Sequence, residues 1–371
     1  MTFASFWRPV DPSKAPCKSK FAGPGGNAAK GAFAGLGLAA FSMAVGACGS
    51  SAASPAAKGT ASKPGSSTPA TSPVALRAST ASWQLRNPLS RMVVLPAGNN
   101  GLAILGGLTA ADTSASGVFR LDLANGSLAT VGTLPAAVHD AAGAVIGSNY
   151  VVFGGGSVST VGSVDAVPSS GGSGTVIGKL PQPRSDCAAV TVNGVVVIAG
   201  GYNGSAADTT VLETTDGTSF RQISSLKVAV RYPALAAVGN SVYVFGGIEV
   251  GGQNSGKLSA SVQKVDISTG TISVVGSLPE PLDGAMAFVL GGHVYLAGGD
   301  SGSAANPVSN PSVWLYQQGP GFTQVATLPL AVSNAGVAVS GGAAWIVGGE
   351  HDGKATAVVQ TLSGTGSGAK S

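Results

Sequence analysis

Charged side chains are scarce in this sequence of 371 residues: Asp, Glu, Lys and Arg together make up only 10%. Residues 1–47 hold five of the 20 basic residues and one of the 16 acidic residues. The rest of the chain therefore balances, at 20 − 5 = 15 basic and 16 − 1 = 15 acidic residues. A nucleic-acid-binding domain needs a basic surface in its folded part. The composition thus argues against nucleic acid as a partner.

Cysteine and histidine are also rare, with three residues of each type. Two of the cysteines precede residue 50, which leaves Cys187 alone and excludes a disulfide framework in the rest of the chain. Cys187 opens the apolar run CAAVTV, so we expect it to be a buried hydrophobic residue. The sequence contains no HxxxH zinc spacing, phosphate-binding glycine loop, nucleophile elbow or EF-hand loop. We therefore expect no metal and no cofactor, and a protein without catalytic activity is favoured.

The first 47 residues are predicted to be a lipoprotein signal peptide. An uncharged run over residues 31–47 follows a basic region, as in a secretory leader. The run ends in Val45-Gly46-Ala47-Cys48, which resembles the lipobox of bacterial lipoproteins. The resemblance implies that Cys48 carries acyl chains and attaches the protein to the outer side of the cytoplasmic membrane, in the cell envelope. A transmembrane anchor, and a cysteine buried in a helix hairpin, remain as alternatives.

Residues 48–78 are rich in Ser, Ala, Pro, Thr and Gly and contain almost nothing that could be buried in a core. Such a composition predicts a disordered tether. A tether of this length has an average reach of about 30 Å. It would hold a folded domain clear of the membrane headgroups.

Glycine is abundant, at 57 residues, and six glycine pairs divide the following chain into repeats of 46 to 52 residues. The pairs are Gly106-Gly107, Gly154-Gly155, Gly200-Gly201, Gly246-Gly247, Gly298-Gly299 and Gly348-Gly349. Seven residues before each pair lies a two-residue turn such as Asn193-Gly194, flanked by apolar runs. Two further short strands follow each pair. Four antiparallel strands per repeat at this period indicate the blades of a propeller.

These repeats resemble the kelch repeat over residues 79–362. The resemblance is carried by the glycine pair, by the aromatic residue in NYVVFGG and SVYVFGG, and by the Leu180-Pro181 phrase, which recurs in other repeats. It implies an all-β fold, a six-bladed kelch-like β-propeller with four antiparallel strands per blade. The sixth repeat lacks a fourth strand before a flexible tail at residues 363–371. We expect the N-terminal segment TASWQL, residues 80–85, to close the ring, which makes Trp83 structural.

Two sets of loops are expected to meet around the channel mouth on one face of such a ring, and much of the scarce charge lies in them. The candidate ligand-rim residues are Arg91, His139, Asp140, Arg184, Asp186, Arg231, Tyr232, Asp283, Asp300, Glu350, His351 and Asp352. In one interpretation these charges pair across neighbouring blades. In the other, Arg184 and Arg231 bind a carboxylate or sugar hydroxyls, and the acidic residues act as acceptors.

The favoured function is a non-catalytic binding or scaffolding module for a protein or an envelope glycan. The alternative is a carbohydrate-active enzyme, because kelch-like extracytoplasmic sugar mutarotases work with a few Arg and acidic residues at the mouth. A purely structural envelope protein is a third possibility. An enzyme should bring Arg184, Arg231 and an acid to one point in a deep mouth, whereas a binding module should show charges that pair locally.

Overall fold

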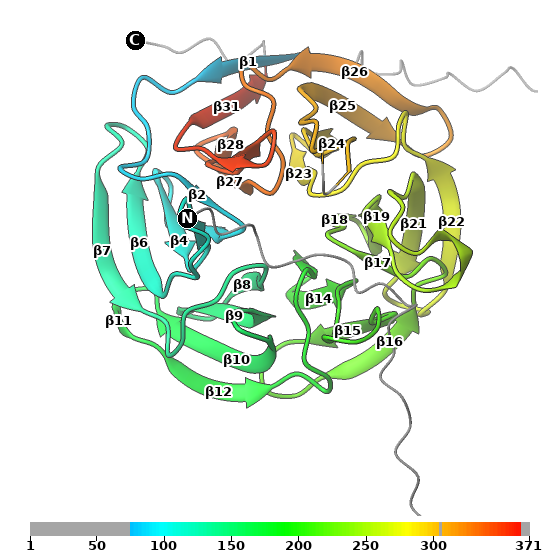
Figure 1. Ribbon diagram of the computed structural model, residues 1–371, viewed down its shortest axis with the longest axis horizontal. Coiled ribbons are helices and arrows are strands. Elements are labelled where there is room, and N and C mark those ends of the chain that lie inside the picture. Colours follow the sequence, from blue (N-terminus) through cyan, green and yellow to red (C-terminus); the bar gives the residue numbers. More distant parts are fainter. Residues whose placement is uncertain (1–74, 304–305, 365–371) are drawn as a thin grey trace, which may run out of the picture. The chain divides into compact units, whose positions relative to one another are not determined.

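The structure, a computed structural model, describes residues 75–303 and 306–364. The predicted signal peptide, Cys48, most of the tether and the end of the tail lie outside the described residues. Six four-stranded units surround a central axis (Figure 1), and each unit is one blade of a six-bladed β-propeller. The predicted fold class is confirmed. Within the described residues, no helix is both long and apolar enough to span a membrane.

Each blade runs from an innermost strand at the axis to an outermost strand at the rim. Blade 1 contains β3 (Val93–Pro96), β4 (Gly101–Leu105), β6 (Gly117–Asp122) and β7 (Leu128–Thr133). Blade 2 contains β8 (Ala142–Ile146), β9 (Asn149–Gly156), β10 (Thr160–Pro168) and β12 (Thr175–Lys179). Blade 3 contains β13 (Ala188–Val192), β14 (Val195–Ala199), β15 (Thr210–Thr214) and β16 (Arg221–Ser225).

The other three blades repeat this order. Blade 4 contains β18 (Ala234–Val238), β19 (Ser241–Phe245), β21 (Ser261–Asp266) and β22 (Ile272–Ser277). Blade 5 contains β23 (Met286–Leu290), β24 (His293–Ala297), β25 (Ser312–Gln317) and β26 (Gly321–Thr327). Blade 6 contains β27 (Gly336–Ser340), β28 (Ala343–Val347), β31 (Val359–Gly364) and β1 (Leu76–Thr80).

Short elements decorate the loops between these strands. They are β2 (Leu89–Ser90), β5 (Leu108–Thr109), β11 (Gly172–Ser173), β17 (Val230–Arg231), β20 (Ile248–Glu249), the 3-10 turn η1 (Gly252–Asn254), β29 (Glu350–His351) and β30 (Lys354–Ala355). Strand β11 pairs in parallel with β7 of the preceding blade. It thereby covers part of an outer edge that would otherwise be free for unwanted strand pairing.

Burial falls from the second strand of each blade to the outermost one. All five residues of β4 are buried, and so are the last four of β14, β19 and β24. The outermost strands β7 and β22 have no buried residue. Continuous apolar runs suit strands that are covered on both faces. The hydrophobic cores accordingly lie between neighbouring blades.

The glycine pairs join each blade to the next one. Gly154 has φ +61°, and a Cβ added to it would lie well inside 3.0 Å of the Arg184 carbonyl oxygen in the following blade. The next glycine, Gly155, donates its N–H to that same carbonyl at 2.8 Å. All six pairs make the equivalent contact, with hydrogen bonds of 2.7–3.0 Å. Glycine is therefore required both for the backbone conformation and for the close approach of the next blade.

The ring is closed by the N-terminal strand, as expected, but by a different segment. Strand β1 pairs antiparallel with β31, from Leu76 opposite Gly364 to Thr80 opposite Gln360. It begins inside the stretch assigned to the tether, and β31 runs two residues into the predicted tail. Leu76 packs into the core between blades 5 and 6. The expected segment, residues 80–85, leaves the sheet after its first residue, and its Trp83 stacks on Trp345 with ring centroids 5.9 Å apart.

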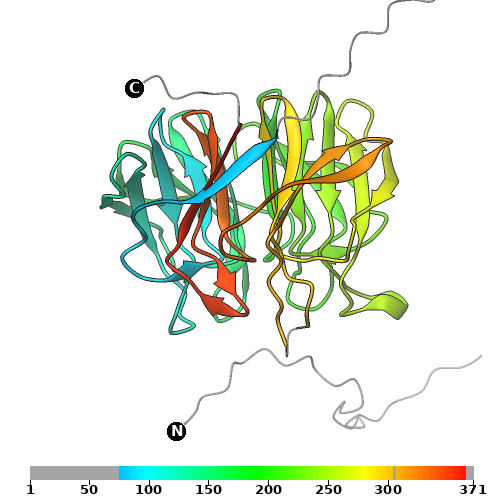
Figure 2. The same ribbon diagram turned by 90° about the horizontal axis from the view of Figure 1, so that it is seen from above.

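The two faces of the ring differ in what they carry. The loops after the glycine pairs, including β29 and β30, lie on one face, which we call the mouth face. Strand β31 runs from that face to the opposite one, so the antiparallel strand β1 begins on the opposite face. Figure 2 shows the two faces edge-on. The chain therefore enters the propeller on the face opposite the mouth.

Candidate functional site

A closed ring of backbone hydrogen bonds surrounds the axis at the mouth face. One residue from each blade, just before the innermost strand, donates its N–H to the carbonyl of the equivalent residue in the preceding blade. The six donor–acceptor distances are 2.8–3.2 Å, and all six residues have φ between +51° and +57°. We call these residues the mouth ring: Arg91, Asp140, Asp186, Tyr232, Gly284 and Asn334.

Five of the six mouth-ring residues carry a side chain although their backbone is left-handed. This conformation costs an L-residue roughly 1–2 kcal/mol, whereas glycine adopts it freely. Gly284 occupies the sixth position with the same φ. The other five positions thus hold Arg, two Asp, Tyr and Asn at a cost that glycine would avoid.

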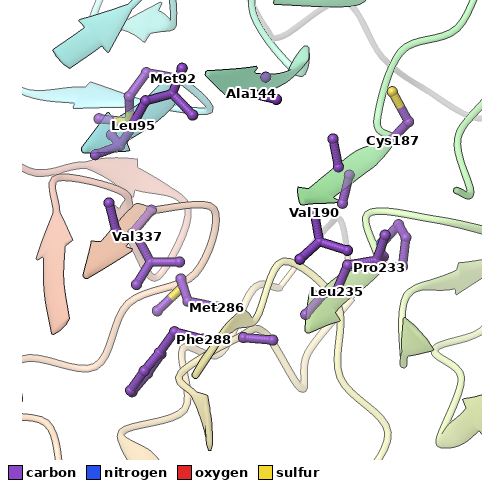
Figure 3. Close-up of a pocket in the computed structure, with 18 of the residues that line it drawn as sticks. Met92, Leu95, Ala144, Cys187, Val190, Pro233, Leu235, Met286, Phe288 and Val337 are labelled. Carbon is purple, nitrogen blue, oxygen red and sulfur yellow. The ribbon is translucent and has the colours of Figure 1, made fainter. Parts of the chain in front are cut away.

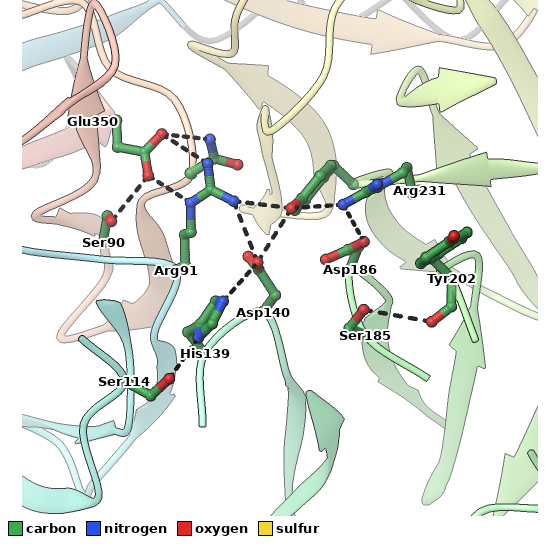
Figure 4. Close-up of polar contacts among 12 residues, drawn as sticks. Ser90, Arg91, Ser114, His139, Asp140, Ser185, Asp186, Tyr202, Arg231 and Glu350 are labelled. Carbon is green, nitrogen blue, oxygen red and sulfur yellow. Dashed lines mark hydrogen bonds and ion pairs between the residues drawn. The ribbon is translucent and has the colours of Figure 1, made fainter. Parts of the chain in front are cut away.

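Arg91 is the centre of the side-chain network at the mouth (Figure 4). Its guanidinium donates to both oxygens of Glu350, from Nε at 2.6 Å and from Nη2 at 3.2 Å. Its Nη1 lies 3.2 Å from Asp140 Oδ2 and 2.9 Å from the hydroxyl oxygen of Tyr232. Arg91 belongs to blade 1 and Tyr232 to blade 4, on opposite sides of the ring. The two side chains therefore meet across the axis.

A second cation supports the opposite half of the network. Arg231 Nη2 lies 2.6 Å from Asp186 Oδ2 and 3.1 Å from the Tyr232 hydroxyl, which itself donates to Asp140 at 3.2 Å. The Arg231 guanidinium also lies 4.7 Å from the ring centroid of Tyr232 and 5.2 Å from that of Tyr202. The arginine is thus held between two aromatic rings and a carboxylate.

The environment of the mouth shifts the pKa of several groups in opposite directions. Burial raises the pKa of Asp186 to about 7, the nearby Asp140 adds to this shift, and Arg231 offsets it only in part. Burial alone would raise the pKa of Glu350, but Arg91 and the hydrogen bonds outweigh it and hold the pKa below its usual range. Burial also lowers the pKa of His139, so its imidazole is neutral at pH 7.

Asp283 and Asp300 form a separate acidic pair next to Gly284. Their backbones exchange hydrogen bonds at 3.1 and 2.8 Å, and Asp300 Oδ1 accepts the N–H groups of Gly302 and Val308. No ion pair to the Asp283 carboxyl occurs within residues 75–303 and 306–364. Burial and the neighbouring Asp300 raise the pKa of Asp283 to about 7.

Arg184 does not belong to the mouth, which corrects the expectation from sequence. Its side chain is fully buried inside blade 3, with 0% residue exposure. The guanidinium lies 2.5 Å from Asp208 Oδ2, bonds the Thr210 hydroxyl and donates to the Gly200 carbonyl at 3.3 Å. Every one of these partners lies within the same blade. Arg184 therefore acts as an internal crosslink and cannot bind a ligand at the rim.

His351 and Asp352 lie on the mouth face but outside the network. Both are exposed, and they belong to the β29–β30 hairpin. The His351 Nδ1 lies 2.8 Å from the Ala331 carbonyl, and Asp352 Oδ1 accepts the Ser309 N–H at 3.0 Å. Seven other candidates are joined by side-chain contacts at the mouth, namely Arg91, His139, Asp140, Asp186, Arg231, Tyr232 and Glu350, whereas Asp283 and Asp300 form the separate acidic pair.

Two network residues were absent from the candidate rim. Ser90 donates to Glu350 at 3.0 Å, and the Asn334 amide donates to the same carboxylate at 3.0 Å. Asn334 lies fourteen residues before Gly348, as Asp186 lies fourteen before Gly200. That constant spacing identifies Asn334 from the sequence. No equivalent signal distinguishes Ser90 from the many other serines.

No group of three or more His, Cys, Asp or Glu side chains within the described residues is arranged to hold a metal ion.

Comparison with known proteins supports the fold. A family model described as Kelch motif matches residues 183–213, in blade 3. No curated protein sequence matches the chain.

Among solved structures, one entitled "Structure of YjhT" is similar to this chain, with a TM-score of 0.65 and 15% sequence identity. The match covers 76% of this chain and 97% of the other. At this identity the likeness concerns the fold alone.

Proposed function

We propose that this protein is a non-catalytic binding module, held outside the cytoplasmic membrane by a lipid on Cys48, that takes its ligand at the propeller mouth. The ligand class is a protein or a glycan of the cell envelope. The observation that carries the proposal is the mouth ring, where five left-handed positions hold polar side chains instead of glycine. Strained backbone of this kind is concentrated at functional sites.

The charges at the mouth support binding over catalysis. Arg91 is paired with Glu350 and Asp140, and Arg231 with Asp186, so each guanidinium has a local partner. Arg184, which an enzyme of the expected kind would bring to the same point, lies inside blade 3. A rigid, pre-paired polar surface with partly exposed guanidinium groups presents donors and acceptors to a ligand without rearrangement.

The course of the chain also supports this function. Strand β1 begins on the face opposite the mouth. A tether that joins the propeller there leaves the mouth face free of its own attachment point. A lipid on Cys48 would supply the membrane affinity, because its acyl chains bury many CH₂ groups.

The binding proposal is tested with purified envelope polysaccharide and envelope protein fractions, by comparing the wild type with Arg231→Gln. The matched control is Arg221→Gln, which removes an exposed arginine on the outermost strand β16. A hydrogen bond to a charged group contributes about 1.5–3 kcal/mol, so Arg231→Gln should weaken binding at least tenfold and the control should not. Equal binding by both variants would contradict a site at the mouth.

The anchor is tested separately by mass spectrometry of the membrane fraction. We expect a mature chain that begins at Cys48 and carries acyl groups on its sulfur and amino group. A mature chain that begins elsewhere and lacks acyl groups would contradict the anchor. That result would leave the binding experiment unaffected.

A carbohydrate-active enzyme is the second candidate, and Asp283 is the observation that favours it. A carboxyl with a pKa of about 7 can both accept and donate a proton near neutral pH. The test follows the interconversion of freshly dissolved α-anomers of neutral, amino and acidic sugars by NMR. Acceleration by the wild type that is lost in Asp283→Asn would support the enzyme, and the absence of any acceleration by the wild type would exclude this activity for the sugars tested.

A further inference from the structure

A channel of about 650 Å³ runs along the propeller axis behind the mouth ring (Figure 3). It is lined by the innermost strand of every blade and begins at the six mouth-ring residues. Its far end lies five residues further along these strands, at Pro96, Val145 and Thr191. At ~3.3 Å per strand residue, the channel is about 16 Å long. Its volume falls in the range of sites that hold small molecules.

The side chains along the channel wall are almost all apolar. The layer next to the mouth ring consists of Met92, Ala141, Cys187, Pro233, Ala285 and Ala335. A second layer consists of Val94, Gly143, Ala189, Leu235, Ala287 and Val337. Alanine or glycine occupies three of the six positions in each layer, which leaves room along the axis. A molecule with an apolar body would therefore contact hydrocarbon along most of its length.

The two ends of the channel differ in chemistry and in access. At the mouth end, the Arg91 guanidinium and the Tyr232 hydroxyl meet across the axis at 2.9 Å. At the opposite end Pro96, Val145 and Thr191 are exposed to solvent. The channel is thus open on the face opposite the mouth and has a polar floor.

Negative charge is in excess on this floor. The ionisable side chains that line it are Arg91, Asp140, Asp186 and Tyr232. Arg91 pairs with both Asp140 and Glu350. Asp186 pairs with Arg231, which does not line the channel. Even so, burial and the nearby Asp140 raise the pKa of Asp186 to about 7. A cation at the end of the channel would stabilise the ionised carboxylate of Asp186 against burial and against the charge of Asp140.

We propose that the axial channel binds an amphipathic primary amine, which enters from the face opposite the mouth and places its ammonium group against Asp186 and Asp140. The apolar walls hold the alkyl chain. The anionic floor selects the ammonium head over a carboxylate, which Asp140 and Asp186 repel. An extended chain advances ~1.2 Å per bond, so about a dozen bonds fit within the channel length.

This site differs from the ligand site at the mouth, because the two are reached from opposite faces of the ring. The ammonium group would reach the side-chain network from inside the channel, whereas a mouth ligand would reach it from the mouth face. Tyr202, which stacks on Arg231, does not line the channel. A Tyr202→Ala variant should therefore retain amine binding even where it loses a mouth ligand.

The experiment titrates the purified full chain with hexylamine, octylamine and decylamine by calorimetry at pH 8. We expect one saturable site whose affinity rises about fourfold per added methylene, as apolar burial predicts. Octanoate should not bind, and octanol should bind at least tenfold more weakly than octylamine. The absence of saturable octylamine binding would overturn the proposal.

Two variants locate the site. Ala189→Phe fills the channel at its second layer and should abolish binding, whereas Ala129→Phe, on the exposed outermost strand β7, should not. Asp186→Asn keeps the shape of the floor and should weaken octylamine at least tenfold. Retained affinity in Ala189→Phe would place binding outside the channel, and unchanged affinity in Asp186→Asn would refute the role of the floor. Circular dichroism confirms that each variant is folded.

The pH profile provides an independent readout. Asp186 faces Asp140, Arg231, Tyr232 and Arg91, and of these groups Asp186 changes charge near pH 7. The ammonium group, with an ordinary amine pKa of about 10.4, stays charged. Octylamine affinity should rise from pH 6 to pH 8 in the wild type and change much less in Asp186→Asn. A profile with the same slope in both proteins would refute the assignment to Asp186.

Discussion

Replacing Gly298 by alanine should destabilise the propeller far more than replacing Gly291, although both glycines are left-handed and flank the same strand, β24. Gly298 has φ +64° and Gly291 has φ +58°. Either substitution therefore costs roughly 1–2 kcal/mol in backbone strain. A Cβ on Gly291 would meet no atom within 4 Å, so no further cost is expected there.

At Gly298 the added Cβ would lie well inside 3.0 Å of the Val332 carbonyl oxygen in blade 6. Relief requires blade 6 to move away, which stretches the 3.0 Å hydrogen bond from the Gly299 N–H to the same carbonyl. Leaving a buried donor and acceptor unpaired costs about 1–3 kcal/mol. The expected loss is thus about 2–5 kcal/mol for Gly298→Ala and about 1–2 kcal/mol for Gly291→Ala.

Urea unfolding followed by tryptophan fluorescence measures both values in the same protein. The Gly291→Ala variant is the matched control, because it carries the same residue change and the same left-handed strain without the contact between blades. Equal losses of unfolding free energy in the two variants would refute the conclusion that close approach of the next blade requires the glycine pairs.

Three further predictions concern the mouth, the thiol and the ring closure. Arg91→Met should lose about 2–3 kcal/mol at pH 7, less than the roughly 3–5 kcal/mol for breaking a fully buried pair, because the arginine is partly exposed. Since the pKa of Glu350 is lowered in the folded protein, this stabilisation is fully present above the ordinary pKa of a glutamate and is lost as the pH falls through the folded pKa. The urea midpoints of the wild type and the variant should therefore differ at pH 7 and approach each other as the pH is lowered through the acidic range. Cys187, whose pKa burial raises to about 12, should resist iodoacetamide at pH 8 until urea unfolds the chain, because almost none of its thiol is ionised, and rapid labelling of the native protein would contradict the raised pKa. Deleting residues 75–80 should lower the thermal midpoint and give oligomers in size-exclusion chromatography, because β31 then presents a free edge; a stable monomer would show that β1 is dispensable.

The fold could be predicted from the sequence because its main determinant is periodic. A glycine pair that must lie close to a carbonyl of the next blade and donate to it recurs once per blade, and the turn between the first two strands stands at a constant distance before it. The closing strand was harder to locate, since Leu76 and Ala78 lie in a segment whose composition resembles the tether. Two apolar residues among Arg, Ser and Thr give too weak a pattern to separate strand from linker.

The candidate site was predicted in part, and Arg184 shows why the rest was missed. Arg184 lies sixteen residues before Gly200, and the residues at the same distance in blades 2, 4, 5 and 6 are Val138, Val230, Leu282 and Val332. All four are buried, so an alignment of the repeats predicts that Arg184 is buried as well. A buried guanidinium needs an acidic partner, because burying an unpaired charge is costly.

The sequence alone does not identify that partner, Asp208, because the loop after the glycine pair varies in length from blade to blade. The mouth network is hidden for a different reason. Arg91 and Tyr232 are 141 residues apart and meet only because their blades are three positions apart in a ring of six. Alignment of the repeats specifies which residues face the axis, whereas contacts across the axis depend on side-chain length and on which blades stand opposite. The six glycine pairs provide the number of blades and hence which blades stand opposite, but the sequence does not give how far each side chain extends across the axis.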